Sequence, residues 1–136
     1  NIPQVGENRA KTFYVIKSVH KNGGIIAGGS DWFVSSMNPL EAIETAVRRQ
    51  DPYLPNDSPR LNFEEAVDVE TMIAAYTING AYLMHQEQKT GSIEVNKKAD
   101  LIILDQNICK IPSSEIHKTK IIQTIFDGQI VYDCQS

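Results

Sequence analysis

The stretch Ile25-Ile26-Ala27-Gly28-Gly29-Ser30-Asp31-Trp32 decides the fold of this chain. Its first three residues form a short and uniformly apolar run, which is typical of a parallel β-strand buried on both faces. The two glycines that follow allow a sharp turn or the close approach of another backbone. Asp31 therefore lies where a predicted strand ends, at the edge on which parallel α/β proteins build their functional sites.

Asp31 has two interpretations at this point. An aspartate after glycines often caps a turn or the helix that follows. A carboxylate at the exit of a buried strand can also belong to a functional site, because parallel α/β proteins build their sites at this edge. The strand and glycine context alone leaves both interpretations open.

The segments on both sides of this stretch predict helices. Residues 9–20 place Phe13, Ile16 and Val19 on one face, and Asn22-Gly23-Gly24 ends that helix. Together with the strand and Asp31, this helix forms half of an α/β repeat.

Asn38 begins the next helix as its N-cap, with Pro39 at the first helical position and Glu41 completing a capping box. The helix ends at Arg48-Arg49, and we expect this pair on a solvated face. There its positive charges would interact favourably with the C-terminal end of the helix dipole. Residues 51–60 hold three of the six prolines and predict an ordered loop.

Two further helical segments follow that loop. Asn62-Phe63-Glu64-Glu65 has a capping-box pattern and predicts a single turn. Asp68 is the expected cap of a longer amphipathic helix over residues 68–84. Gly80 lies on the apolar face of that helix at a cost of about 1 kcal/mol in helix propensity, so we expect it to permit close packing.

From residue 91 the pattern becomes that of strands. Four runs have this character: residues 92–95, 101–104, 120–126 and 129–132. Asp127-Gly128 predicts a tight hairpin between the last two, and residues 112–117 predict one helical turn.

The chain thus divides into an α/β part, residues 1–90, and a β part, residues 91–136. One strand makes no sheet and a few strands make only one layer, so neither part looks complete.

Composition and charge exclude several classes of function. The chain has 136 residues, 41% of them hydrophobic, which is typical of one globular domain, and its net charge is −4. No Lys/Arg cluster exists to neutralise phosphates, so we expect no nucleic-acid partner. No apolar run is long enough for a membrane span, and the first residues do not resemble a signal peptide.

The cysteines and histidines offer no metal site of their own. Cys109 and Cys134 form no C-x-x-C motif, and we expect them to be small buried residues in a reducing compartment, which points to the cytoplasm. His20, His85 and His117 have no metal-ligand spacing, and we expect them to be ordinary solvated or capping residues.

Several motifs in this order resemble the C-terminal part of the amidohydrolase superfamily of metal-dependent hydrolases, in the branch that includes N-substituted formamide deformylase. They are Gly29-Ser30-Asp31-Trp32, Asn38-Pro39-Leu40 with Ala46-Val47, residues 76–81, Gly91-Ser92-Ile93-Glu94 with residues 99–105, and Asp127-Gly128 with Val131. Two departures are Phe33, where the branch usually has proline, and Val95-Asn96, which replaces a usual Pro-Gly.

This resemblance implies an α/β fold that is a fragment of a (β/α)8 barrel plus part of a small β-sandwich. Residues 1–90 would supply the last barrel strand and its flanking helices, and residues 91–136 would supply sandwich strands. A full barrel needs about 200–250 residues, so the remaining strands would lie outside this chain.

The resemblance also implies a catalytic role for Asp31. In the family the carboxylate at this position contacts a divalent metal ion and the water bound to that ion. The metal that we expect in the complete enzyme is zinc. The carboxylate accepts the proton of that water and passes it to the leaving nitrogen. Trp32 would line the substrate pocket, although packing is the alternative role. The other metal ligands would lie upstream, so we expect this chain alone to bind no metal and to be inactive.

Two functions remain to be distinguished. In the first, the chain is part of a hydrolase that cleaves non-peptide, amide-like C–N bonds of small molecules. In the second, it is a non-catalytic α+β module for binding or assembly. Either would pair with the remainder of a barrel or with a second copy, as a homo-oligomer, because a truncated barrel exposes apolar surface. Nucleotide binding at the glycines is disfavoured, since no G-x-G-x-x-G occurs.

Overall fold

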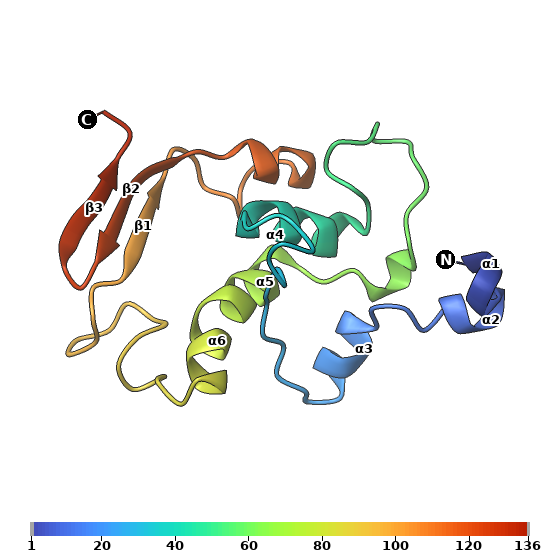
Figure 1. Cartoon of the computed structure of the whole chain (residues 1–136), viewed down its shortest axis with the longest axis horizontal. Coiled ribbons are helices and arrows are strands. Elements are labelled where there is room, and N and C mark those ends of the chain that lie inside the picture. Colours follow the sequence, from blue (N-terminus) through green and yellow to red (C-terminus); the bar gives the residue numbers. More distant parts are fainter. Residues whose placement is uncertain (1, 136) are drawn as a thin grey trace.

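The computed structural model describes residues 2–135 and shows helices in the middle of the molecule with a small sheet at one side (Figure 1). The helices are α1 Ile2–Val5, α2 Glu7–Ala10, α3 Ile16–Lys21, α4 Pro39–Arg48, α5 Val69–Tyr76 and α6 Ile78–Leu83, with 3-10 turns η1 Phe63–Glu65 and η2 Ser113–Lys118. The strands are β1 Leu101–Leu104, β2 Ile121–Phe126 and β3 Gln129–Asp133.

The core lies where α4, α5 and the segment around η2 meet. Its buried apolar residues are Leu40, Ile43, Ala46, Val67, Met72, Ala75, Ile108 and Ile116. Helix α4 therefore packs on one side against α5, and on the other against a turn that is about 70 residues further along the chain. This contact joins the predicted α/β part to the predicted β part.

Local capping signals produce α4 as predicted. The Asn38 side chain accepts a hydrogen bond from the Leu40 amide at 3.1 Å, and Pro39 occupies the first turn. Glu41 accepts from the Asn38 side-chain amide at 3.3 Å, so the two side chains contact each other directly. The helix ends at Arg49, whose φ of 56° is left-handed.

Two predicted helices are interrupted. The segment predicted as one helix over 9–20 is α2 and α3, separated at Tyr14, which has a left-handed φ of 54°. At this break the Asn62 side-chain amide donates hydrogen bonds to the Ala10 and Phe13 carbonyls, at 2.8 and 3.1 Å. In a continuous helix these carbonyls would accept hydrogen bonds from backbone amides of the next turn. The predicted helix over 68–84 breaks at Thr77 into α5 and α6, although Asp68 caps it as expected, accepting from the Thr71 amide at 2.7 Å.

The prediction of a β-strand at residues 25–27 is wrong for this chain. The segment has no regular secondary structure, and within the described residues it has no strand partner. Two contacts from the helices hold it instead: the Asn79 side chain donates to the Ile26 carbonyl at 2.9 Å, and the Gly28 amide donates to the Ala75 carbonyl at 2.9 Å. A strand is defined by hydrogen bonds to a neighbour, and no neighbour lies in residues 2–135.

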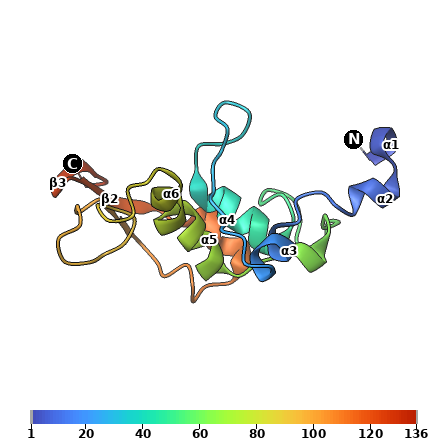
Figure 2. The same ribbon diagram turned by 90° about the horizontal axis from the view of Figure 1, so that it is seen from below.

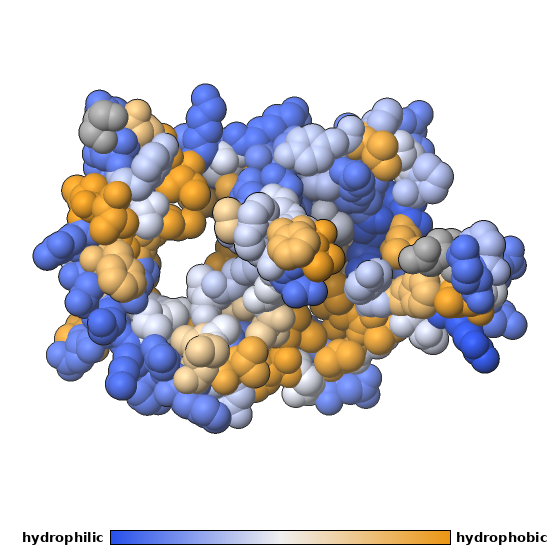
Figure 3. Space-filling view, in the orientation of Figure 1, coloured by the Kyte–Doolittle hydropathy of each residue, from blue (hydrophilic) through white to orange (hydrophobic). Residues whose placement is uncertain are grey.

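The three strands form one antiparallel sheet in the order β1-β2-β3. Asp127-Gly128 makes the predicted hairpin, with left-handed φ values of 50° and 79°. The strand predicted at 92–95 does not form; these residues are a loop with Ile93 and Val95 exposed. A cavity of about 730 Å³ lies between α6, residues 90–93 and the sheet, where the space-filling view is hollowed (Figure 3).

The glycines and cysteines correct two further expectations. Gly80 does not permit close packing, because an added Cβ would meet only the Ala75 carbonyl oxygen, at an ordinary 3.8 Å. Close packing occurs at Gly28 instead, since a Cβ added there would lie 2.5 Å from the Tyr76 ring. Cys109 and Cys134 are free and exposed, not buried.

Candidate active site

Asp31 is the first residue of a turn over residues 31–34. This turn belongs to the connection between α3 and α4, part of which stands out from the helices (Figure 2). The Val34 amide donates to the Asp31 carbonyl at 2.7 Å and closes a tight turn, and the Ser35 hydroxyl contacts the Ser30 carbonyl. At the far end, Asn38 begins α4. The loop is therefore tethered at both ends, by Gly28 to α5 and by Asn38 to α4.

The Asp31 carboxylate is exposed and available. Among the described residues, no hydrogen bond or ion pair holds its side chain, and its backbone adopts a left-handed φ of 50°. It is also the only charged residue between Lys21 and Glu41. Trp32 is 63% exposed, so it does not pack into the core of this chain. Neither residue lines a cavity described here.

Metal-ligating side chains do not gather elsewhere in the described residues. Within residues 2–135, no group of three or more His, Cys, Asp or Glu side chains lies close together. His20 is exposed in α3, and His85 is exposed just after α6. Asp31 could supply one oxygen ligand to a metal ion.

The expectation that every histidine is an ordinary solvated or capping residue is wrong for His117. Its side chain is only 12% exposed, and Nδ1 lies 2.7 Å from the Glu44 carboxylate. The same Glu44 oxygen accepts the His117 backbone amide at 2.9 Å. These two contacts join α4 to turn η2 through a single carboxylate oxygen.

Arg48 and Arg49 are buried rather than solvated. Arg48 pairs with Glu44 one turn earlier in α4, and its guanidinium also donates to Gln50 and Asn56 at 2.6 and 2.7 Å. Arg49 donates to the Leu61 carbonyl at 3.0 Å, and burial lowers its pKa. The i,i+4 spacing of Glu44 and Arg48 on the apolar side of α4 is the signal that could have predicted this pair.

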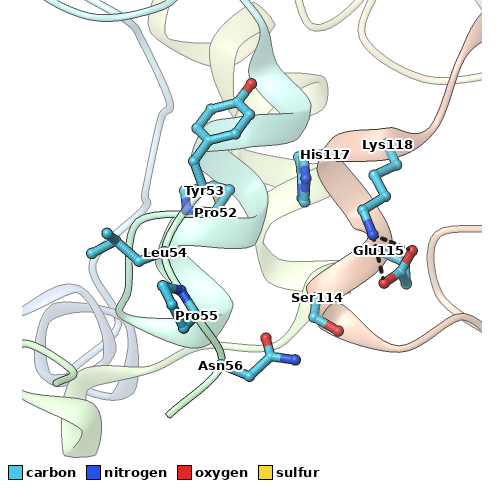
Figure 4. Close-up of a pocket in the computed structure, with 9 residues that line it drawn as sticks. All are labelled: Pro52, Tyr53, Leu54, Pro55, Asn56, Ser114, Glu115, His117 and Lys118. Carbon is cyan, nitrogen blue, oxygen red and sulfur yellow. Dashed lines mark hydrogen bonds and ion pairs between the residues drawn. The ribbon is translucent and has the colours of Figure 1, made fainter. Parts of the chain in front are cut away.

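A small cavity of about 330 Å³ is lined on one side by His117 (Figure 4). Its walls are the loop over residues 52–56 and turn η2, including Ser114, Glu115, His117 and Lys118. The Tyr53 and His117 rings contact each other edge-on, with 5.3 Å between their centroids. The Tyr53 hydroxyl donates to Glu41 at 3.0 Å, which raises the pKa of Tyr53. The ring contact joins the loop to η2, and the hydrogen bond joins it to α4.

Comparison with known proteins identifies the family. The model of the amidohydrolase family matches residues 2–132. The chain belongs to the amidohydrolase family. This amidohydrolase chain is 32% identical to the Bacillus subtilis protein YtcJ over 132 residues, which cover 97% of the chain and 25% of YtcJ. It is 28% identical to N-substituted formamide deformylase of Arthrobacter pascens, covering 94% of the chain and 23% of that enzyme.

A solved structure shares the fold of the amidohydrolase chain. An amidohydrolase from Thermotoga maritima superposes with a TM-score of 0.64 at 21% identity, over 91% of this chain and 26% of the other. The chain thus spans about a quarter of the length of these relatives. Within residues 2–135, no helix has the length and apolar character needed to cross a membrane.

Proposed function

We propose that this chain forms the C-terminal part of a metal-dependent hydrolase that cleaves non-peptide, amide-like C–N bonds of small molecules. Residues 1–90 then supply the end of a (β/α)8 barrel, and residues 91–136 supply strands of the companion β-sandwich. The observation that carries the proposal is the apolar segment at residues 25–27, which has no regular secondary structure. It is tethered to the helices through Asn79 and Gly28 but has no strand partner in the described chain.

The lack of a strand partner for residues 25–27 in the described chain implies that the strands beside them lie outside residues 2–135. A strand edge presents unpaired amide and carbonyl groups, which are stable only when another strand or water satisfies them. Ile25 is 56% exposed although it belongs to an apolar run. The remainder of a barrel would pair with this segment and would cover Ile25, and Asp31 would then lie at the rim where the strands end.

Asp31 is the proposed proton carrier of the reaction. When bound, a divalent ion, zinc in our proposal, lowers the pKa of a water molecule toward 7. Asp31 would contact that ion and accept the proton of the water. It would then donate the proton to the nitrogen that leaves, because an amine is expelled easily only after protonation. Its freedom from other partners within the described chain leaves both carboxylate oxygens available.

The relatives support the class of bond. The name of the Arthrobacter pascens relative, N-substituted formamide deformylase, describes the cleavage of a formyl C–N bond. A 5'-deoxyadenosine deaminase of Methanobrevibacter smithii is 38% identical over 79 residues, which cover 51% of this chain. Trp32, next to Asp31, is the proposed substrate-contacting residue. We also propose a cytoplasmic location, consistent with two free thiols.

The test is Asp31→Asn in the complete hydrolase that carries this segment. Loss of a general base costs typically 10²–10⁴-fold in rate, so we expect kcat to fall by about that factor while the unfolding midpoint stays unchanged. Asp57→Asn is the matched control, because Asp57 is also an exposed loop aspartate. Equal activity of both variants would instead favour the second candidate, a non-catalytic assembly module.

The second candidate rests on exposed apolar surface. Besides Ile25, several large apolar residues of the loop after Asp31 are exposed, and so are Ile93, Phe126 and Ile130 in the β part. In that case a second copy of the chain, not the rest of a barrel, would cover them. A homo-oligomer of residues 1–136 with no C–N hydrolase activity in the complete protein would support it.

A further inference from the structure

The stretch that contains Asp31 is connected to the helices only through its two ends. The Val34 amide donates to the Asp31 carbonyl at 2.7 Å, which is a bond inside this stretch. Within the part of the chain that the structure describes, residues 29–37 form hydrogen bonds only with one another and with Asn38. The hydrogen bonds that fix Asp31 relative to the helices therefore lie at Gly28 or before it, and at Asn38.

Gly28 is the nearer of these two ends, three residues before Asp31, whereas Asn38 is seven residues after it. Three residues of chain span at most about 11 Å, so a displacement of Gly28 also moves Asp31. The chain here passes beside α5 on its way to α4 (Figure 1). The Gly28 amide donates to the Ala75 carbonyl at 2.9 Å, and the Tyr76 ring packs against Gly28.

The junction of α5 and α6 supplies both partners of this segment. The Ala75 carbonyl belongs to the last turn of α5, where helix carbonyls lack intrahelical partners, and it accepts the Gly28 amide. Thr77 interrupts the helix, and Asn79 follows in the first turn of α6. The Asn79 side-chain amide donates to the Ile26 carbonyl at 2.9 Å. One acceptor and one donor of the junction thus hold residues 26–28.

We propose that Asn79 is a positioning residue of the reaction, and that its hydrogen bond to the Ile26 carbonyl holds the chain so that the Asp31 carboxylate lies where it transfers a proton. The inference rests on the proposed role of Asp31. Proton transfer requires the two heavy atoms to lie about 2.6–3.2 Å apart, and a displacement of about 1 Å can slow a reaction about 100-fold. Asn79 bonds to the backbone at Ile26 and acts on Asp31 through the chain between them.

The test variant is Asn79→Asp in the complete hydrolase. It keeps the shape of the side chain but replaces the N–H donor with a carboxylate oxygen, which only accepts hydrogen bonds and would repel the Ile26 carbonyl. We expect kcat to fall about 10–100-fold at a temperature where the variant is fully folded. We expect KM to change less than about twofold, since a group that acts on the transition state alone affects kcat.

A second variant, Asn79→Ala, removes the same donor without adding a charge. It should lower kcat in the same way, and it replaces Asn79→Asp in the test if that variant does not fold. Unchanged kcat in the folded Asn79 variants overturns the inference.

Asn62→Asp is the matched control. Asn62 is also half-buried, and its side-chain amide donates to the backbone carbonyls of Ala10 and Phe13. The same chemical change therefore removes hydrogen bonds of the same kind but leaves residues 26–28 held by α5 and α6. We expect kcat within about twofold of the wild-type value, even where the unfolding midpoint is lower. An equal loss of kcat in Asn62→Asp and Asn79→Asp would show a general effect of destabilisation and overturn the inference.

The double variant Asn79→Asp with Asp31→Asn separates this inference from the function on which it rests. If Asn79 acts through Asp31, the double variant is no slower than Asp31→Asn alone, because residues that act as one unit are not additive. A further loss of about 10–100-fold in the double variant overturns the inference and leaves the role of Asp31 intact. Full activity of Asp31→Asn overturns the proposed function, and the inference with it.

Discussion

Glu44 shows how one residue joins two distant segments. It is 0% exposed, and its two carboxylate oxygens accept hydrogen bonds from Arg48 in its own helix and from His117 in turn η2. A buried carboxylate without partners would be very unfavourable, so these contacts must form together for α4 to pack. At the residue scale, this carboxylate connects the part that carries Asp31 to the part that carries the sheet.

We expect Glu44→Gln to destabilise the protein by about 3 kcal/mol, because removal of one member of a buried ion pair leaves the other charge buried without compensation. Equilibrium unfolding in urea, followed by circular dichroism, measures the change. Glu70→Gln is the control, since Glu70 is exposed at the start of α5 and its loss costs less than about 1 kcal/mol. Similar destabilisation in both variants would contradict the role of Glu44.

Asp100 gives a prediction about pH. Its carboxylate accepts a hydrogen bond from the Asp127 backbone amide at 2.8 Å and another from the Thr90 hydroxyl at 3.0 Å. Both bonds lower the pKa of Asp100, and the bond from the Asp127 amide has the larger effect. A carboxylate with a lowered folded-state pKa contributes stability above its unfolded-state pKa of about 3.9. That contribution is lost as the pH falls through the lower folded-state value.

We therefore expect wild-type stability to decrease between about pH 5 and pH 2 more steeply than that of Asp100→Asn, which cannot titrate at this position. Urea midpoints measured at several pH values test this. Parallel pH curves for the two proteins would show that Asp100 does not contribute to acid sensitivity.

At the scale of elements, α4, η2 and the β2–β3 hairpin were predictable, because their signals are local. The turn η1 forms without the predicted capping box, since the Asn62 side chain makes no cap hydrogen bond. Asn38-Pro39 and Asp127-Gly128 act through hydrogen bonds and φ preferences within a few residues. The segments at 25–27 and 92–95 were not, because a strand exists only beside a partner that is distant in sequence. The break at Tyr14 depends on Asn62, about 50 residues away, and no local pattern predicts it.

Gly28 fixes the segment that leads to Asp31, and it supplies the third prediction. An added Cβ would lie 2.5 Å from the Tyr76 ring, so we expect Gly28→Ala to destabilise the protein by about 1–3 kcal/mol through overpacking. At the adjacent Gly29, nothing lies within 4 Å of an added Cβ. Gly29→Ala is therefore the matched control, and we expect it to change the free energy of unfolding by less than about 1 kcal/mol.

The unfolding midpoints of the two variants provide the measurement. Equal effects at both glycines would show that the approach of residue 28 to Tyr76 does not determine stability. In the complete hydrolase, the same Gly28→Ala variant should also reduce turnover, since the segment it displaces positions Asp31.

At the scale of the whole molecule, the two parts differ in how they are buried. The core surrounds α4, while the sheet keeps large apolar residues such as Phe126 and Val131 exposed. The chain also spans about a quarter of the length of its relatives. Three features are consistent with each other if further chain completes them: residues 25–27 have no strand partner in the part of the chain that the structure describes, the sheet keeps apolar residues exposed, and Asp31 is the single proposed metal ligand.

We expect residues 1–136, purified alone, to hold less than 0.1 zinc per chain after dialysis, because a catalytic zinc needs about three protein ligands and Asp31 supplies one. Metal analysis by mass spectrometry measures the content. The complete hydrolase is the positive control, with about one or two ions per chain. One tight zinc bound to residues 1–136 alone would contradict the assignment of the other ligands to upstream residues.

The sequence by itself determined the family, the helix caps, the hairpin and the position of Asp31 after an apolar run, because these depend on motifs and on interactions within a few residues. Only the tertiary structure decided that Glu44, Arg48 and His117 form one buried cluster, that Gly28 meets Tyr76, and that residues 25–27 have no strand partner within residues 2–135. Burial and strand pairing depend on which distant segments meet in space, and hydrogen bonds across such distances leave no regular spacing in the chain.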